Sequence, residues 1–340
     1  MNIVHLLSGL AIGGKERVAL GLAERAIGQG HSASLVLYDT PFRSAAEDFD
    51  PGGVPTYYLK RGPGLDLSFS IRLARHLRKF RPDVVHAHND TALFYAALAR
   101  AWAFPAHPRI VATFHAWPAW GGRAARWLTR AAGLSATVSA VSDDLAGRLI
   151  RSGWLFRCGV IWNGIDTDLF APAGPNGDWR EKLDLVGGDF LVGHVGRFDP
   201  VKRHRDLLEA AARVQRVRPD ITFVLIGQGE LLEAVRGQGA ELPNLRFVRN
   251  ASDMPSLLRS LDALVLCSED EACPLALLEG MASGLPIAAT AVGGVPCILR
   301  GGATGTECGL LVPPRDPESL ARAILQLAGD AGLRRNLAEA

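Results

Sequence analysis

Residues 263–290 read ALVLCSEDEACPLALLEGMASGLPIAAT and predict a strand, a loop, a helix and a second strand. The apolar run ALVLC (263–267) has the length of a buried strand, and residues 275–284 have the length of a helix. PIAAT (286–290) then returns to a strand-like composition. A strand, helix and strand in this order predict neighbouring parallel strands covered by helices, which is the pattern of an α/β fold.

The same alternation continues along the rest of the chain in both directions. Apolar runs predict strands at 2–7, 32–38, 83–88, 109–114, 136–141, 159–162, 190–196, 221–227, 245–248, 263–267 and 286–290. Amphipathic stretches predict helices at 15–29, 69–81, 91–103, 121–132, 142–152, 203–217, 230–238, 255–260, 275–284, 317–328 and 330–338.

With 340 residues, the chain exceeds what one hydrophobic core usually organises. We therefore expect two Rossmann-like domains, at 1–170 and 186–340. The stretch FAPAGPNGDWREKLDL (170–185) is rich in Pro and Gly, so we expect 171–185 to be the linker. Two such domains are expected to face each other across a cleft at the carboxyl ends of their strands, where open α/β sheets bind ligands.

The charge is divided unevenly. Residues 1–170 carry 19 Lys and Arg against 13 Asp and Glu, a net charge of +6, while residues 171–340 have a net charge of −4. A basic first half indicates an anionic acceptor or a nearby membrane surface, and ordinary solvated helix faces are the alternative. The excess is too small and scattered to predict nucleic-acid binding.

Cysteine usage and hydropathy predict a cytoplasmic protein. The five cysteines are odd in number and form no CxxC pair, which argues against a disulfide framework or a zinc site. No run of 18 apolar residues occurs, and no basic segment precedes the first apolar run, so we expect neither a membrane span nor a signal peptide. Peripheral contact with the inner face of a membrane through the basic first half stays open.

Two loops are suited to binding an anion, one through a pair of glycines and the other through a pair of cationic side chains. Gly13 and Gly14, in SGLAIGGKERV (8–18), can bring backbone amides to an anion at a helix start, and a tight turn without a ligand is the alternative. Arg197 and Lys202 lie on the loop of GHVGRFDPVKRHRDLL (193–208) and suit a diphosphate. The alternative is a pair of solvated loop cations.

The third loop is the one within 263–290. The free amides of Leu275 and Ala276 at the helix start can hold phosphate oxygens. Glu279, further along the helix, suits a ribose diol, and Glu271 on the loop suits sugar hydroxyls, because carboxylates offer several acceptor sites. The alternative is a pair of surface glutamates.

Two further groups allow a choice of interpretations. His86 and His88 alternate at a strand end and either support the sheet or contact the acceptor; no third ligand stands at a telling sequence distance, so we expect no metal. The segment 117–133 carries Arg123, Arg126 and Arg130 with Trp120 and Trp127. It either contacts lipid headgroups or packs as a helix with solvated arginines.

The motifs together resemble a known family. GRFDPVK, LIGQGE, SEDEACPLALLEGMASGLPIAATAVGG and GLLVPPRDPESLARAI resemble the donor domain of the retaining GT-B glycosyltransferases of family 4. GGKERV, DVVHAH, TFHA, SAVSDDL and NGID resemble the acceptor domain of that family, so the likeness spans nearly the whole chain.

The resemblance implies a role for each matched residue. Arg197 and Lys202 match the pair that binds the diphosphate, Glu279 the glutamate that binds ribose, and Glu271 the glutamate that grips the donor sugar. His115 of TFHA matches a histidine that faces the transferred sugar, and the glycine pair at 13–14 matches a loop that closes over the phosphates. His115 and Glu271 are thus the expected catalytic residues, with a structural role as the alternative for His115.

The implied activity is a retaining hexosyltransferase. It would move a sugar from a UDP- or GDP-sugar to a glycan, a lipid-linked glycan or a small molecule, with no cofactor and no metal, since no DxD motif lies on a suitable loop. The alternatives are an epimerase or phosphorylase built on a related two-domain shell and a sugar-nucleotide-binding protein without turnover.

Three departures from the family pattern stand out. Ala272, Cys273 and Pro274 replace a common Gly-Phe-Gly run, and Pro274 removes one backbone donor, which predicts a turn shaped for a different sugar. GQGE (227–230) replaces the usual GDGP. The chain stops after LRRNLAEA (333–340), so we expect the helix that crosses back to the first domain to be missing or the chain to be shortened.

Overall fold

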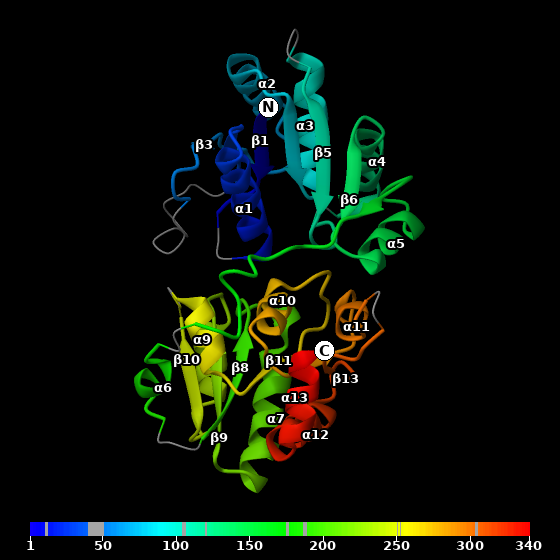
Figure 1. The fold of residues 1–340 in the computed structure, drawn as a ribbon. Helices are drawn as coiled ribbons and strands as arrows, with labels where there is room; N and C mark the ends of the chain where they lie inside the picture. The colour runs from blue at the N-terminus through cyan, green and yellow to red at the C-terminus, as the bar shows by residue number, and fades with distance from the viewer. Residues whose placement is uncertain are drawn as a thin grey trace. The chain divides into compact units, whose positions relative to one another are not determined.

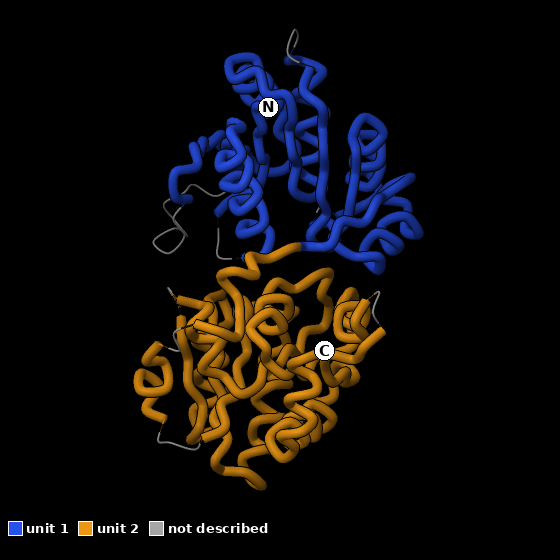
Figure 2. The backbone as a smooth tube through the Cα atoms, viewed as in Figure 1, with its two compact units in different colours: residues 1–163 blue, residues 164–340 orange. Residues whose placement is uncertain are grey.

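The computed structural model describes residues 1–10, 13–39, 51–103, 107–119, 121–174, 177–185, 189–249, 251, 253–302 and 305–340. The chain folds into two compact units, residues 1–163 and 164–340, which Figure 2 shows in blue and orange. Each unit is an α/β sandwich with its own parallel sheet (Figure 1). The fold class expected from the sequence is confirmed for both.

The sheet of the first unit has seven parallel strands in the order β3-β2-β1-β4-β5-β6-β7. The strands are β1 (Asn2–Leu7), β2 (Ser32–Leu37), β3 (Thr56–Tyr58), β4 (Val84–His88), β5 (Arg109–Phe114), β6 (Thr137–Ala140) and β7 (Gly159–Val160). The order reverses direction between β1 and β4, and ligands of such sheets bind at the carboxyl ends of the strands beside this point.

Five helices connect these strands in the described residues. They are α1 (Gly14–Gly28), α2 (Leu67–Phe80), α3 (Asp90–Trp102), α4 (Gly122–Gly133) and α5 (Asp143–Arg151). Asp66 accepts a hydrogen bond from the amide of Phe69 and caps α2, and Ser142 caps α5 through the amide of Leu145. The caps explain why these two helices begin where they do.

The second unit repeats the same strand order with six parallel strands, β10-β9-β8-β11-β12-β13. The strands are β8 (Phe190–Val195), β9 (Ile221–Ile226), β10 (Leu245–Val248), β11 (Ala263–Leu266), β12 (Ile287–Thr290) and β13 (Leu310–Val312). The direction reverses between β8 and β11, so the loops that follow these two strands meet at one edge of the sheet.

Helices cover both faces of the second sheet. They are α6 (Trp179–Lys182), α7 (His204–Val217), α8 (Leu232–Gln238), α9 (Met254–Ser260), α10 (Leu275–Ala282), α11 (Val295–Leu299), α12 (Pro317–Gly329) and α13 (Ala331–Glu339). Val192 belongs to the apolar core with α7 and α12, and its neighbour Leu191 belongs to the opposite core with α9 and α10. Alternate residues are therefore buried on opposite faces, as in sheets covered on both sides.

The expected linker at 171–185 lies inside the second unit, and so do residues 164–170, which we had assigned to the first domain. Phe170 and Leu183 are buried in the core beside α9 and α10. The guanidinium of Arg180, on α6, lies 2.5 Å from the carboxylate of Asp262. The Pro and Gly content of residues 171–185 predicts a linker, but these apolar and ionic contacts hold the segment against the second sheet.

Candidate active site

The carboxyl ends of β8 and β11 bring Lys202 and Glu271 into contact. Lys202 ends a short 3-10 turn after β8, and its Nζ lies 2.5 Å from Oε1 of Glu271, on the loop after β11. The two side chains are only 17% and 10% exposed. An ion pair this sheltered, at the point where the strand order reverses, marks the edge at which an α/β unit binds its ligand.

The loop that carries Glu271 is held on both sides. Ser268 Oγ donates to Oε1 of Glu271 at 2.7 Å, and Thr290 Oγ1 donates to the carbonyl oxygen of Ser268 at 2.6 Å. The amide of Gly294 donates to the carbonyl oxygen of Glu271 at 2.9 Å. Gly293 has φ +52°, and a Cβ there would lie 1.9 Å from that carbonyl oxygen. The AVGG segment after β12 therefore fixes the backbone of Glu271.

Arg197 lies on the loop between β8 and α7, as predicted, but its side chain is paired locally. Its Nη2 is 2.9 Å from the carboxylate of Asp199, and the side chain is 60% exposed. A long, exposed side chain with one neighbouring partner keeps its freedom to move to an anion, whereas Lys202 is already fixed by its contact with Glu271.

The GQGE segment supports this loop through its backbone. The amide of Phe198 donates to the carbonyl oxygen of Gln228 at 2.7 Å. Gly227 and Gly229 have φ +145° and +152°, and a Cβ at either would lie within 2.4 Å of backbone oxygens of Gly196 or Phe198. The two glycines are needed for this close approach, and Gln228 contributes its backbone carbonyl to it.

Helix α10 follows the Glu271 loop directly. Pro274 is its N-cap residue, and no side chain caps the first turn, where Leu275 and Ala276 lie. Glu279 is only 3% exposed, and with the shelter of Glu271 this excludes the alternative of two surface glutamates. Four of the predicted residues therefore share one loop and helix: Glu271, Leu275, Ala276 and Glu279.

His115 lies in the first unit, at the end of β5. Its amide donates to Oδ1 of Asn89 at 2.8 Å, and its Nε2 is 2.9 Å from Nδ1 of His88. Burial, reinforced by His86 and Lys15, lowers the pKa of His115 to about 3. The imidazole is therefore neutral at physiological pH and offers one donor and one acceptor nitrogen.

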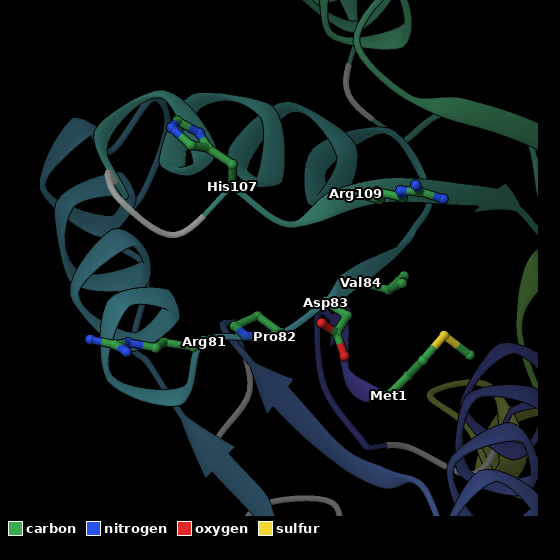
Figure 3. A pocket seen from close by; sticks show the side chains of 7 residues that line it. All are labelled: Met1, Arg81, Pro82, Asp83, Val84, His107 and Arg109. Carbon is green, nitrogen blue, oxygen red and sulfur yellow. The ribbon is translucent and has the colours of Figure 1, made fainter.

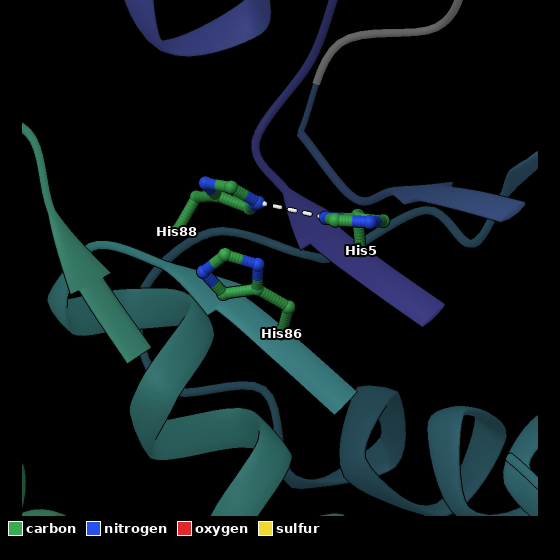
Figure 4. A group of neighbouring side chains, drawn as sticks. All are labelled: His5, His86 and His88. Atoms are coloured by element: carbon green, nitrogen blue, oxygen red, sulfur yellow. Dashed lines mark hydrogen bonds between the residues drawn. The ribbon is translucent and has the colours of Figure 1, made fainter. Parts of the chain in front are cut away.

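The sequence shows no third ligand near His86 and His88, but the structure places His5 beside them. In the register of β1 and β4, His5 is paired with His86. His86 and His88 alternate along β4 and so share one face, and ring nitrogens of all three residues lie within 4.8 Å of one another (Figure 4). Parallel pairing across 81 residues of sequence was not visible in the motif DVVHAH alone.

Gly13 and Gly14 lie at the start of α1 in the first unit, and residues 11 and 12 are outside the described part of the chain. Lys15 Nζ lies 2.8 Å from Ser8 Oγ and 3.1 Å from the carboxylate of Glu16. A Cβ at Gly13 would lie 2.5 Å from Oε2 of Glu16. The helix start thus combines one ammonium group, one carboxylate and a backbone without side-chain bulk.

Helix α4 carries a basic and aromatic surface, on which Arg123, Arg126 and Trp127 are exposed, while Arg130 is half-buried with its guanidinium over the Phe156 ring. Trp127 is 68% exposed, and Trp120 lies outside the described residues. With Ser152 and Gly153, the four side chains line a hollow of about 210 Å³. The helix therefore does not pack by this tryptophan, which favours the surface-binding alternative.

A second hollow, of about 740 Å³, lies at the amino-terminal edge of the first sheet (Figure 3). It is lined by Met1, Arg81, Pro82, Asp83, Val84, His107 and Arg109. These residues precede or begin strands β1, β4 and β5, so the hollow is at the opposite edge from the loops described above. It contains none of the residues that the sequence singled out.

All five cysteines are free, in agreement with the absence of a disulfide framework. No helix in the described residues is long and apolar enough to cross a membrane.

Comparison with known proteins decides the family. The model of "Glycosyltransferase Family 4" matches residues 12–169, and that of "Glycosyl transferases group 1" matches residues 189–330. The chain belongs to the family 4 (group 1) glycosyltransferases.

Two curated relatives of this glycosyltransferase carry glycosyltransferase names. The putative glycosyltransferase EpsF of Bacillus subtilis is 28% identical over 300 residues, 84% of this chain and 78% of EpsF. The UDP-Gal:alpha-D-GlcNAc-diphosphoundecaprenol alpha-1,3-galactosyltransferase of Escherichia coli is 28% identical over 281 residues, 78% of this chain and 71% of the relative.

Solved structures confirm that this family 4 glycosyltransferase has the GT-B fold of two Rossmann-like domains. HepE of Anabaena in complex with UDP has a TM-score of 0.80 and 22% identity, covering 99% of this chain and 93% of HepE. WaaG, a glycosyltransferase involved in lipopolysaccharide biosynthesis, has a TM-score of 0.75 and 18% identity, covering 99% of this chain and 93% of WaaG.

Proposed function

We propose that this glycosyltransferase takes a sugar from a UDP- or GDP-sugar and transfers it to a glycan, a lipid-linked glycan or a small molecule. The observation that carries the proposal is the sheltered Lys202–Glu271 pair at the carboxyl ends of β8 and β11. Complexes of the similar HepE with UDP and with UDP-glucose support the donor class.

The Lys202–Glu271 pair places a group that binds the diphosphate next to a group that binds the donor sugar. The Lys202 ammonium has three N–H donors and uses one for Glu271, so two remain for a diphosphate. Glu271 already accepts from Lys202 and Ser268, which suits a neutralised carboxylate that accepts from sugar hydroxyls. The donor sugar and the diphosphate would therefore bind side by side.

The remaining residues complete the donor site in this proposal. The free amides at Leu275 and Ala276, with Arg197, stabilise the charge that develops on the leaving diphosphate. Glu279 accepts from the ribose diol, a part of the donor remote from the reacting bond. These cationic and backbone groups supply the electrostatic stabilisation that a metal supplies elsewhere, so we propose transfer without a metal at the phosphates.

We further propose that transfer retains the anomeric configuration. Glu271 is held by two donors as a hydrogen-bond acceptor, so we assign it no role as a nucleophile. The leaving phosphate oxygen would take the proton of the acceptor hydroxyl on the same face of the sugar. His115, neutral and held by His88 and Asn89, would offer one hydrogen bond to the transferred sugar and no positive charge.

A donor-hydrolysis screen against a panel of UDP- and GDP-sugars tests the proposal. We expect release of nucleoside diphosphate from one donor class, the same rate in excess EDTA, and a product of retained configuration by NMR once an acceptor is found. An isomerised nucleotide sugar would indicate an epimerase, sugar phosphate as product a phosphorylase, and tight donor binding without turnover a binding protein. A rate that disappears with EDTA and returns with Mg²⁺ would contradict the proposed metal-free donor site.

A second proposal concerns membrane contact through the first unit, at the inner face of a cytoplasmic membrane. It rests on α4, where exposed Trp127 stands among arginines around the 210 Å³ hollow. Arginines beside an exposed indole suit a layer of anionic lipid headgroups. Such contact would bring the enzyme to a lipid-linked acceptor.

A further inference from the structure

Three imidazoles converge at the carboxyl ends of β1 and β4 in the first unit. Nδ1 of His5 lies 3.2 Å from Nε2 of His88, and His86 contributes the third ring nitrogen of a group in which all separations are within 4.8 Å. Figure 4 shows the His86 ring below the His5–His88 pair, with one nitrogen toward it. His5 and His88 are buried, at 2% and 1% exposure.

Two of the three nitrogens that face away from this group, those of His86 and His88, have hydrogen-bond partners. Nε2 of His86 is 2.8 Å from Oγ1 of Thr113, and Nδ1 of His88 is 2.9 Å from Nε2 of His115. With protons on these outer nitrogens, Nδ1 of His86 and Nε2 of His88 direct lone pairs inward. Metal-binding histidines are held in the same way, by donating their other N–H to an outer partner.

The histidines are also in the protonation state that a metal requires. Burial lowers the pKa of His5 to about 3 and that of His86 to about 4, so both are neutral at physiological pH. Neutral imidazole is the form that binds zinc, so no proton has to be displaced from a cationic ring.

We propose that His5, His86 and His88 bind one Zn²⁺ ion, with a fourth position open to water. Two nitrogens at 2.0–2.1 Å from a tetrahedral ion lie about 3.3 Å apart, close to the 3.2 Å between His5 and His88. The ring nitrogen of His86 lies within 4.8 Å of the other two, so His86 must move toward the ion to complete the set. His5 would bind Zn²⁺ through Nδ1. The imidazole proton of His5 then lies on its Nε2, which has no hydrogen-bond partner in the described structure.

The three histidines belong to the first unit and the proposed donor-binding residues to the second, although His88 also contacts His115, the histidine proposed to face the transferred sugar. The zinc proposal is tested by metal binding and the proposed function by sugar transfer, so each can fail without the other. The odd number of cysteines and the lack of a CxxC pair argue against a cysteine zinc site, and that argument does not extend to three histidines from two strands. The ligand spacing of 81 and then 2 residues gives no recognisable sequence motif.

The test uses the full chain without a polyhistidine tag, freed of metal by dialysis against chelator. We expect one Zn²⁺ per chain by calorimetry and elemental analysis, and a visible Co²⁺ spectrum of four-coordinate type. His86→Ala and His88→Ala should abolish this binding, while His107→Ala, at an exposed histidine outside the group, should bind as the unchanged protein does.

Thr113→Val keeps all three ligands and removes the outer partner of His86. Loss of such a partner typically weakens metal affinity by about 10- to 100-fold, so Thr113→Val should bind Zn²⁺ more weakly but still with one ion per chain. An unchanged circular dichroism spectrum and an unchanged thermal unfolding transition show that each variant is folded. No zinc bound by the unchanged protein, or equal affinity in the His86 and His88 variants, would overturn the proposal.

Discussion

Lys202 and Arg197 differ in how firmly the structure holds them, and this difference should be measurable. Lys202→Ala removes a sheltered ammonium from both Glu271 and the diphosphate, and Arg197→Ala removes a 60% exposed side chain. Each loses one electrostatic contact to the leaving group, which should cost about 3 kcal/mol of barrier and lower kcat by roughly 100-fold or more. Steady-state kinetics of donor hydrolysis measures both effects.

Thermal unfolding separates the two variants further. Lys202→Ala leaves the Glu271 carboxylate without its cation and should lower Tm, whereas Arg197→Ala should leave Tm nearly unchanged. Arg205→Ala is the matched control, because Arg205 lies in the first turn of α7, the helix that follows the Lys202 turn, with a side chain 80% exposed. Near-normal turnover in both site variants would show that the diphosphate binds elsewhere.

The two glutamates should separate nucleotide binding from sugar transfer. Glu279 is proposed to hold the ribose, so Glu279→Gln should weaken binding of the donor and of free nucleoside diphosphate alike, with some loss of turnover. Glu271 is proposed to hold the sugar, so Glu271→Gln should spare the diphosphate and reduce transfer. Calorimetric affinity for free UDP or GDP in both variants is the decisive comparison. Loss of this affinity in Glu271→Gln alone would mean that the roles are reversed.

At the scale of elements, the β12–α11 turn should matter as much as the loop that carries Glu271. Gly293 and Gly302 have nearly equal φ, +52° and +50°, but a Cβ at Gly293 meets the Glu271 backbone at 1.9 Å and one at Gly302 meets nothing within 4 Å. An alanine at either position must adopt the left-handed backbone conformation, which lowers the free energy of unfolding by about 1 kcal/mol. Only Gly293→Ala must also displace the Glu271 loop.

Denaturant unfolding and donor hydrolysis should therefore diverge for these two glycines. Gly302→Ala should lose about 1 kcal/mol of stability and keep its hydrolysis rate. Gly293→Ala should lose more stability and most of its rate. Equal effects of the two substitutions would mean that the loop tolerates the shift, and that the backbone of Glu271 is not fixed by this turn.

The sequence predicted those helices and strands that are long enough to show a repeating pattern of apolar residues. All eleven expected strands and all eleven expected helices correspond to elements of the structure. The strands β3 and β13 have three residues each, and α6 and α11 have four and five, which is too short for a period to be read.

The site could be predicted in part for a related reason. Lys202 and Glu271 could be assigned to loops after strands, because the loops follow apolar runs. Their contact depends on β8 and β11 being neighbours, and strand order is not contained in local patterns. The contact between His5 and His86 also depends on strand order. The close approach of Gly293 to the Glu271 backbone depends on it too, although a Gly-Gly pair after a strand is a sequence signal for such an approach.

For the molecule as a whole, both units use one strand order but differ in charge. The strand order reverses between β1 and β4 in the first unit and between β8 and β11 in the second. Each sheet therefore has one edge suited to a ligand. Residues 1–163 carry 19 Lys and Arg against 11 Asp and Glu, a net charge of +8, and residues 164–340 carry 18 against 24, a net charge of −6. Any attraction to an anionic surface should therefore come from the first unit.

Vesicle binding tests this division of charge, with α4 as the expected contact. The protein should bind vesicles that contain anionic lipid, bind neutral phosphatidylcholine vesicles weakly, and lose affinity as salt rises, because the Debye length shortens. Arg123→Gln with Arg126→Gln should cost about 2 kcal/mol, or roughly 30-fold in affinity, at about 1 kcal/mol per arginine near the surface. Trp127→Ala should weaken binding at every salt concentration, since the indole contributes apolar contact.

Arg205→Gln with Arg213→Gln is the matched control for this experiment. It removes the same charge from α7 of the second unit, where both side chains are exposed at 80% and 45%. Because the long-range attraction depends on net charge and the contact depends on α4, the control should shift affinity far less than the α4 pair. Equal losses in the two double variants would show that net charge alone attracts the protein, and that α4 is not the contact.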